Sequence, residues 1–305
     1  MLRRDWEALP VTIARKTVTH MVSAGGRRTT AIVHLEGGGE HGYGEDVTFQ
    51  EHDLLPASAP LPWRFSGSFR EFSLGLASHV VFERAPGYEV VRNYRHWAFE
   101  AAALDLALRQ AGARFDEVVG RASEPVRFVV SPPPGFSAFP PQARLKIDAV
   151  DLRPRLPVDV VDFKEGGDRA AVESALALYP DALLEDPPVV VPGARVSWDI
   201  RITSADEVRR LPDRPAAINV KPARLGSLSA LFDLYELCAA ERIEMYGGGQ
   251  HELGPGRAQI QLLASLFHPQ APNDVAPSGY NEPRPPAGLP TSPLEITPRV
   301  GFGTS

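Results

Sequence analysis

The second half of the chain alternates short apolar segments with candidate helices, and this alternation constrains the fold more than any other feature. Each apolar segment has the length of a buried strand and is followed by a loop or a helix. The candidate strands are residues 126–130, 143–147, 158–162, 182–185, 194–199, 217–221 and 243–246. The candidate helices are residues 168–178, 204–211, 227–240 and 256–267. This α/β repetition predicts a parallel sheet with helices outside it, and a closed (β/α) barrel is its natural form.

Three connections between these strands are too short or too rich in proline to hold an outer helix. Residues 148–157 separate the second and third candidate strands and include two prolines, whereas a helical crossover needs roughly a dozen residues or more. The connections 131–142 and 186–193 are similar. We therefore predict a modified TIM-type (β/α) barrel that lacks several of its outer helices.

The first part of the chain has a different pattern. Residues 29–35 and 46–49 are candidate strands, and the glycine-rich segment 36–45 between them is interpreted as a wide hairpin connection. A phosphate-binding loop would need a helix directly after it, and none is predicted. Residues 95–110 have the spacing of an amphipathic helix that ends at Gly112. This mixture predicts an α+β N-terminal domain.

Charge and cysteine content exclude several classes of partner. The net charge of −6 arises from 32 basic and 38 acidic residues without long runs of one sign, so a nucleic acid or an anionic membrane is not expected. Cys238 is the only cysteine, which excludes an internal disulfide and a cysteine-based zinc cluster and fits a reducing compartment. The first residues do not resemble a secretory signal, and no segment has the length of a membrane span. We expect a cytoplasmic protein with a small-molecule substrate, which could form a homo-oligomer.

Charged residues recur at the carboxyl ends of the predicted strands, where a parallel α/β barrel assembles its active site. Asp162, Glu185 and Asp199 end three successive strands, and their hard oxygen donors suit Mg²⁺. Lys146 and Lys221 lie at the ends of strands on either side of these acids. The sequence therefore predicts a magnesium site flanked by two lysines.

These residue types together fit abstraction of a proton alpha to a substrate carboxylate. The reaction creates an enolate, and a divalent cation on the carboxylate oxygens offsets the developing charge. A lysine can act as the base only when it is neutral, so we expect burial, the metal and a second ammonium to lower its pKa. Two lysines on opposite sides of a substrate would give racemisation or epimerisation. One base beside a fixed cation would give elimination or isomerisation.

Four further residues are candidate substrate contacts. Arg144 shares a strand face with Lys146, although an ion pair with a neighbouring acid explains it slightly better. Gly248, Gln250 and His251 belong to a glycine-rich loop that should face the predicted site, although a flexible surface loop explains them equally well. The remaining histidines show no metal-ligand spacing. They are His20, His34, His41, His52, His79, His96 and His268.

The order of these residues resembles the muconate-lactonizing-enzyme branch of the enolase superfamily. This branch includes o-succinylbenzoate synthases, N-acylamino-acid racemases, dipeptide epimerases and cycloisomerases. The similarity covers approximately residues 27–267 and extends beyond the charged positions. Its other motifs are the Gly-Tyr-Gly-Glu segment 42–45, the alanine-rich segment 98–107, the Glu-Asp-Pro segment 185–187, the Lys-bearing segment 218–227 and the glycine-rich segment 246–252.

The resemblance implies a fold, a cofactor and roles for the site residues. It implies a capping domain at 1–122, completed by residues 277–305, and a barrel domain at 123–276. Asp162, Glu185 and Asp199 would bind Mg²⁺, while Lys146 and Lys221 would be the acid/base pair. The reaction would be racemisation, epimerisation, cycloisomerisation or dehydration of a small carboxylate through a metal-stabilised enolate.

Two residues depart from the family pattern. Ile200 replaces the usual acid after Asp199, and Lys164 stands where a neutral amide is common, so its ammonium could replace the ion. These departures keep a second hypothesis open, namely a catalytically silent relative that binds a ligand or partner. A third is a metal-free hydrolase in which Asp162 and Glu185 act as a carboxylate pair. Lysines on both sides of the acids argue against this last hypothesis.

Overall fold

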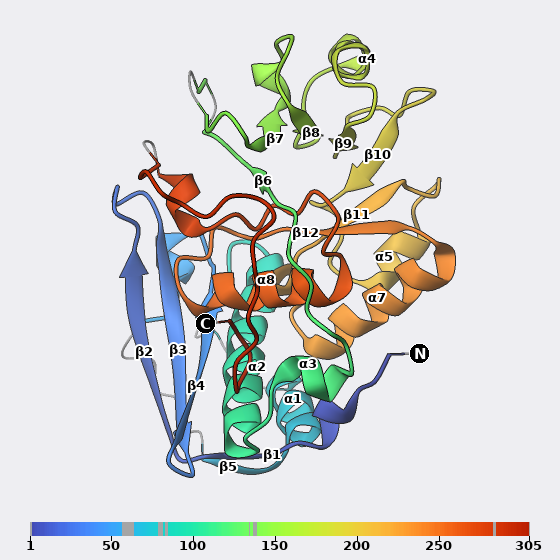
Figure 1. Cartoon of the computed structure of the whole chain (residues 1–305). Coiled ribbons are helices and arrows are strands. Elements are labelled where there is room, and N and C mark those ends of the chain that lie inside the picture. The colour runs from blue at the N-terminus through green and yellow to red at the C-terminus, as the bar shows by residue number, and fades with distance from the viewer. Residues whose placement is uncertain are drawn as a thin grey trace.

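The structure is a computed structural model that describes residues 2–56, 64–78, 82, 85–133, 135–136, 139–282 and 285–304. An N-terminal antiparallel sheet packs against a long helix, and a curled parallel sheet with its helices lies next to both (Figure 1). The N-terminal strands are β1 Pro10–Ile13, β2 Arg15–Val22, β3 Thr29–Gly37, β4 Glu40–Asp46 and β5 Phe65–Ser68. The helices of this part are α1 Phe69–Ala77, α2 Val90–Gln110 and α3 Phe115–Val119.

The seven strands predicted for the second half are confirmed as one parallel sheet, in the order β12-β11-β10-β9-β8-β7-β6. They are β6 Val129–Val130, β7 Arg144–Asp148, β8 Val158–Asp162, β9 Leu183–Glu185, β10 Arg195–Trp198, β11 Ala217–Val220 and β12 Glu244–Gly247. Residues 273–274 join the two edges of this sheet, because they form parallel bridges to Phe128 beside β6 and to Gly248 beside β12. The sheet therefore curls into a modified barrel.

The predicted loss of outer helices is also confirmed. Helices follow β8, β10, β11 and β12, but β6, β7 and β9 lead into the next strand through loops and short turns in the described residues. Residues 134, 137 and 138 of the first of these loops lie outside the described part. The helices are α4 Arg169–Leu178, α5 Ala205–Arg209, α6 Pro222–Leu225, α7 Leu228–Glu241 and α8 Pro255–Phe267. The 3₁₀ turns are η1 Asp5–Ala8, η2 Glu51–Asp53, η3 Ala149–Asp151 and η4 Ser278–Asn281.

The glycine-rich segment of the N-terminal part is a strand rather than a wide connection. The prediction of a strand at 46–49 is wrong, because strand β4 ends at Asp46 and pairs with β3 across a tight turn at Gly38 and Gly39. Gly44 faces helix α2, where a Cβ atom would overlap the carbonyl oxygen of Ala98. The glycines of β4 therefore allow the sheet and the helix to pack closely.

A buried carboxylate links the N-terminal sheet to the barrel. Glu45, on β4, accepts backbone hydrogen bonds from Leu253 (2.6 Å), Gly254 (3.0 Å) and Gly256 (3.0 Å) at the start of α8. The free N–H groups of a helix N-terminus favour an anion at this place. Glu45 thereby fixes the end of the 247–254 loop, which continues from β12 into the site.

Helix α2 is the centre of the hydrophobic core. Residues 97–108 are buried on all sides of this helix, between the N-terminal sheet and the helices of the barrel. No helix among the described residues has both the length and the apolar character needed to cross a membrane.

Candidate functional site

The carboxyl ends of the barrel strands surround a cavity of about 490 Å³. Lys146, Asp162, Asp199, Lys221 and His251 all line this cavity. Asp162, Asp199 and Lys221 lie at or immediately after the ends of β8, β10 and β11, because parallel strands present their carboxyl ends at one rim of the sheet. Lys146 lies within β7, two residues before its end. The structure thus brings the predicted lysines and acids to one place.

Lys146 lies at the centre of a group of carboxylates. It is 6% exposed, and its ammonium nitrogen is 2.6 Å from Glu185, 3.4 Å from Asp162 and 3.6 Å from Asp274. Burial lowers the pKa of Lys146, but the carboxylates outweigh burial and hold that pKa well above its usual value. The expected lowering of a lysine pKa assumed a metal ion bound beside the lysine, and it stays a prediction for Lys146.

Glu185 is fully buried at the end of β9 and is held by several partners. One oxygen accepts from Lys146, and the other accepts from the Asn219 side-chain amide (3.1 Å) and from the Tyr246 hydroxyl. Burial raises the pKa of Glu185 to about 7, against the opposing effect of Lys146. Asn219 and Tyr246, which the sequence analysis did not single out, thus help Lys146 to fix the orientation of this carboxylate.

Asp199 belongs to a second ion-paired group on the other side of the cavity. Its Oδ2 lies 2.5 Å from the Lys221 ammonium, and its Oδ1 lies 3.3 Å from Nε of Arg224. Burial raises the pKa of Asp199, but the charges of Lys221, Arg224 and Lys146 and the hydrogen bond from Lys221 together outweigh burial, so the net shift is downward. Asp199 is therefore ionised at neutral pH.

Asp186, which the sequence analysis did not propose as a site residue, lies beside Asp162 and Glu185. One oxygen from each of these three residues lies within 4.8 Å of the others. Asp186 has a φ of 47°, and its two oxygens accept backbone hydrogen bonds from Asp199 (3.0 Å) and Ile200 (2.9 Å). It therefore ties the end of β9 to the end of β10 and positions Asp199.

The donor set fits a hard divalent cation. The cluster holds five carboxylates and three side-chain cations, which leaves an excess of two negative charges when all are ionised. Asp199 Oδ1 is buried and has no hydrogen-bond partner, as expected of an oxygen that can still coordinate an ion. The residues counted are Asp162, Glu185, Asp186, Asp199, Asp274, Lys146, Lys221 and Arg224.

The two departures from the family pattern have clear places in the structure. Lys164 does not insert its ammonium among the acids, because it pairs with Asp148 (2.6 Å) on the cavity wall. The backbone N–H of Lys164 donates to Asp162 (3.0 Å). Ile200 lines the cavity, and its carbonyl accepts from Arg224 (3.0 Å). Lys164 therefore leaves the acidic cluster accessible to an ion.

The candidate substrate contacts are divided between two ends of the barrel. Arg144 lies at the amino end of β7, where it pairs with Asp159 (2.9 Å) and lines a separate cavity of about 690 Å³. Gln250 and His251 line the cavity that holds the lysines. Gly248 packs directly against Lys221, and a Cβ atom there would come within 2.8 Å of Lys221 Cε. The 247–251 loop therefore lies over the acid-lysine cluster, whereas Arg144 lies at the opposite end.

Asp274 is a site residue that local sequence patterns do not identify. It follows a proline-rich stretch and belongs to the short bridge that joins the edges of the sheet. Its Oδ1 accepts from Ser131 (2.7 Å). Burial raises the pKa of Asp274, but Lys146, the Ser131 hydrogen bond, Lys221 and Arg257 together hold that pKa below its usual value. Asp274 follows the last barrel helix, at the position where the eighth strand of a complete barrel would end. This position is the signal in the sequence that could have revealed it.

Family comparisons match both parts of the chain. The family described as "Domain of unknown function (DUF8230)" has an N-terminal domain model that matches residues 5–118. Its C-terminal domain model matches residues 141–282.

Curated relatives match a shorter stretch. The o-succinylbenzoate synthase of Bacillus subtilis (strain 168) is 35% identical over 85 residues, which is 27% of this chain and 23% of that protein. The N-succinylamino acid racemase of Amycolatopsis sp is 38% identical over 61 residues, or 20% of this chain and 17% of that protein. These alignments therefore span about a quarter or less of each relative's length.

Solved structures match the fold over almost the whole chain. Muconate cycloisomerase from Pseudomonas fluorescens has a TM-score of 0.72 at 15% identity, covering 98% of this chain and 96% of that one. Dipeptide epimerase from Enterococcus faecalis V583 has a TM-score of 0.67 at 18% identity, covering 96% and 99%. At these identities the comparison shows a shared fold.

Proposed function

Because the chain belongs to the DUF8230 family and has the fold of the muconate-lactonizing branch of the enolase superfamily, we propose that it abstracts a proton alpha to a substrate carboxylate. The reaction would depend on Mg²⁺ and would end in racemisation, epimerisation, cycloisomerisation or dehydration. The relatives named o-succinylbenzoate synthase and N-succinylamino acid racemase point to the same general chemistry.

One observation carries the proposal, namely that two lysines and an acidic cluster line the same cavity. Lys146 is bound to the acids at the ends of β8 and β9, and Lys221 is bound to Asp199 at the end of β10. A substrate carbon bound in this cavity would have the ammonium group of Lys146 on one side and that of Lys221 on the other. This arrangement suits transfer of a proton to one lysine and from the other.

Asp162, Glu185 and Asp199 would hold the ion, with Asp186 positioning Asp199 through the backbone. When bound, Mg²⁺ supplies positive charge beside the substrate carboxylate, where negative charge develops. Arg224 and Lys221 balance the charge of Asp199.

Proton exchange in D₂O tests this function directly. N-acylamino acids, dipeptides and acid sugars are incubated with protein and Mg²⁺, and loss of the alpha-proton signal is followed by NMR. Lys146→Met and Lys221→Met should abolish exchange. Lys164→Met is the matched control, because Lys164 lines the same cavity but pairs with Asp148. Equal exchange in all four proteins would contradict the assigned roles.

A catalytically silent relative is the second candidate, and one observation favours it. Both lysines already satisfy the carboxylates that would hold the ion, with contacts of 2.6 Å and 2.5 Å. If the lysines hold these acids permanently, calorimetry should detect no Mg²⁺ binding and no substrate of the panel should exchange. If the wild type binds Mg²⁺ and Asp162→Asn binds it more weakly, the lysines do not block the acids, and the silent-relative hypothesis loses its support.

A further inference from the structure

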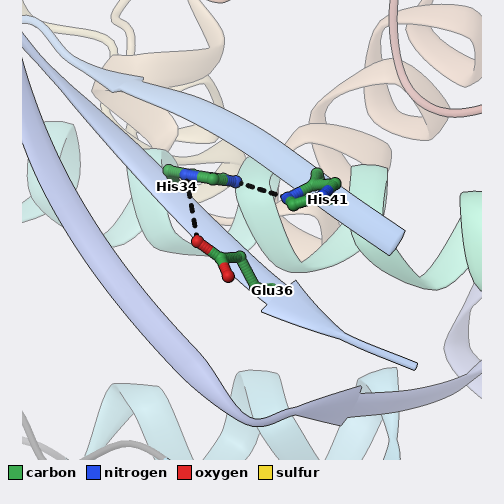
Figure 2. Close-up of side chains that lie close together, drawn as sticks. All are labelled: His34, Glu36 and His41. Carbon is green, nitrogen blue, oxygen red and sulfur yellow. Dashed lines mark hydrogen bonds and ion pairs between the residues drawn. The ribbon is translucent and has the colours of Figure 1, made fainter. Parts of the chain in front are cut away.

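Three potential metal ligands meet on the N-terminal sheet, away from the barrel site. His34 and Glu36 lie two residues apart on β3, and His41 lies on the neighbouring strand β4 (Figure 2). The antiparallel register places His41 directly opposite Glu36. Side chains two apart on a strand share a face, and paired residues on adjacent strands share it too. The three side chains therefore project together.

This face is the one that turns away from helix α2. The opposite face of β4 carries Gly42 and Gly44, which pack directly on the helix backbone. His41 is exposed, while the side chains of His34 and Glu36 are 20% and 25% exposed. An ion from solution can thus reach the three residues without any opening of the core.

The ligand atoms are already close together. Nε2 of His34 lies 2.9 Å from Nδ1 of His41, and Nδ1 of His34 lies 3.6 Å from an oxygen of Glu36. One ligand atom from each residue can be chosen so that all three lie within 4.8 Å of one another. Two nitrogens at about 2.0–2.1 Å from a tetrahedral zinc ion lie roughly 3.3 Å apart, so the imidazoles need to separate by only a few tenths of an ångström.

The surroundings hold the first histidine in place. The ring of Tyr43 stacks on His34 with centroids 4.7 Å apart and an interplanar angle of 9°. The Thr17 hydroxyl lies 3.2 Å from Nδ1 of His34. A polar partner at one ring nitrogen orients the other nitrogen toward a metal, as is usual for histidine ligands. His34 is thereby oriented toward His41.

We propose that His34, Glu36 and His41 form a binding site for Zn²⁺ or a similar divalent transition-metal ion, separate from the Mg²⁺ site of the barrel. Two imidazoles and one carboxylate are a donor set that zinc accepts, with a water molecule in the fourth position. The ion would replace the hydrogen bond between the two imidazoles and would join β3 to β4 near their turn. The site would therefore stabilise the sheet on which Glu45 stands.

Arg15 is a neighbouring cation that opposes this site. Its guanidinium lies 3.7 Å from Glu36 across the β2–β3 pair, and its side chain is 67% exposed. A bound ion would take Glu36 from this weak surface pair. Arg15→Gln should therefore tighten zinc binding by no more than about fivefold, the size of an exposed ion pair.

Calorimetric titration with Zn²⁺ tests the site, in millimolar Mg²⁺ so that the oxygen donors of the barrel are occupied. His41→Gln should weaken zinc binding by more than about tenfold, because loss of a ligand costs more than loss of an outer partner. His20→Gln is the matched control, since His20 is exposed on β2 of the same sheet. Zinc should also raise the melting temperature of the wild type and of His20→Gln but not that of His41→Gln.

Because His41 is exposed, its replacement should leave the fold intact, and circular dichroism checks this. Glu36→Gln provides a second variant with the same expected loss. Equal zinc affinity in the wild type, His41→Gln and Glu36→Gln would overturn the proposal. So would an absence of zinc binding to the wild type under these conditions.

Discussion

Glu100→Gln should make the folded protein more stable above neutral pH and remove part of its pH dependence. Glu100 is buried on helix α2 and accepts hydrogen bonds from the Ser73 hydroxyl and from the Leu228 backbone N–H (2.7 Å) at the start of α7. Burial raises its pKa to about 7, although both hydrogen bonds act in the opposite direction. A glutamine can keep both bonds, because its carbonyl oxygen accepts from Leu228 and its amide donates to Ser73.

The magnitude follows from the difference between the folded and unfolded pKa. The shift from 4.5 to about 7 corresponds to roughly 3 kcal/mol of folding free energy, at about 1.4 kcal/mol for each pKa unit. Below pH 4.5 Glu100 is protonated in both states and costs nothing. As the pH rises, the unfolded chain ionises first, so the wild type loses stability until the folded pKa of about 7 is passed.

Urea unfolding at several pH values between 5 and 8 measures this effect. The free energy of unfolding of the variant should increase relative to that of the wild type as the pH rises, and this difference should level off above neutral pH. Glu185 has a folded pKa of about 7 as well, but it is present in both proteins and cancels in the difference. A difference in unfolding free energy that stays constant from pH 5 to 8 would refute the assignment of this titration to Glu100.

Three other substitutions, the first with a matched control, test the packing and the site. Gly44→Ala should destabilise the protein by about 3 kcal/mol or more in urea unfolding, because the new Cβ overlaps the backbone of α2. Gly75→Ala is the matched control and should be neutral or slightly stabilising, because a Cβ there meets nothing within 4 Å. Lys146→Met should lower the free energy of unfolding by about 3–5 kcal/mol without metal, because Glu185 loses its buried partner, and thermal unfolding measures this. Added Mg²⁺ should recover part of the lost stability. Asp186→Asn should cost about 1.5–3 kcal/mol, because one of two backbone N–H donors loses its acceptor, and calorimetry should show weaker Mg²⁺ binding. Unchanged stability in Gly44→Ala, Lys146→Met or Asp186→Asn would contradict the corresponding contact.

The barrel was predictable from the sequence because its strands are local features. Most of the strands are short, mainly apolar segments, and a charged residue ends or directly follows β7, β8, β9, β10 and β11. The short proline-rich connections have no room for a helix. Lys146, Asp162, Asp199 and Lys221 come together for the same reason, since parallel strands place their carboxyl ends at one rim.

The N-terminal part was less predictable because glycine has two opposite roles in a sequence. The glycines of 36–45 were interpreted as a connection, yet Gly42 and Gly44 lie inside a strand that approaches a helix. Local patterns cannot distinguish a turn glycine from one required by close packing. The displaced second strand, predicted at 46–49, is a consequence of that interpretation.

By itself, the sequence determined the seven parallel strands and the missing outer helices, and it indicated the acids and lysines of the candidate site, because strand period and strand ends depend on adjacent residues. Only the tertiary structure decided which carboxylate each lysine contacts, the part played by Asp186 and Asp274, and the meeting of His34 with His41. Those features depend on the register between strands and on burial, which join residues far apart in the chain or on different strands. Charges and imidazoles acquire their partners, and their pKa values, only after those contacts have formed.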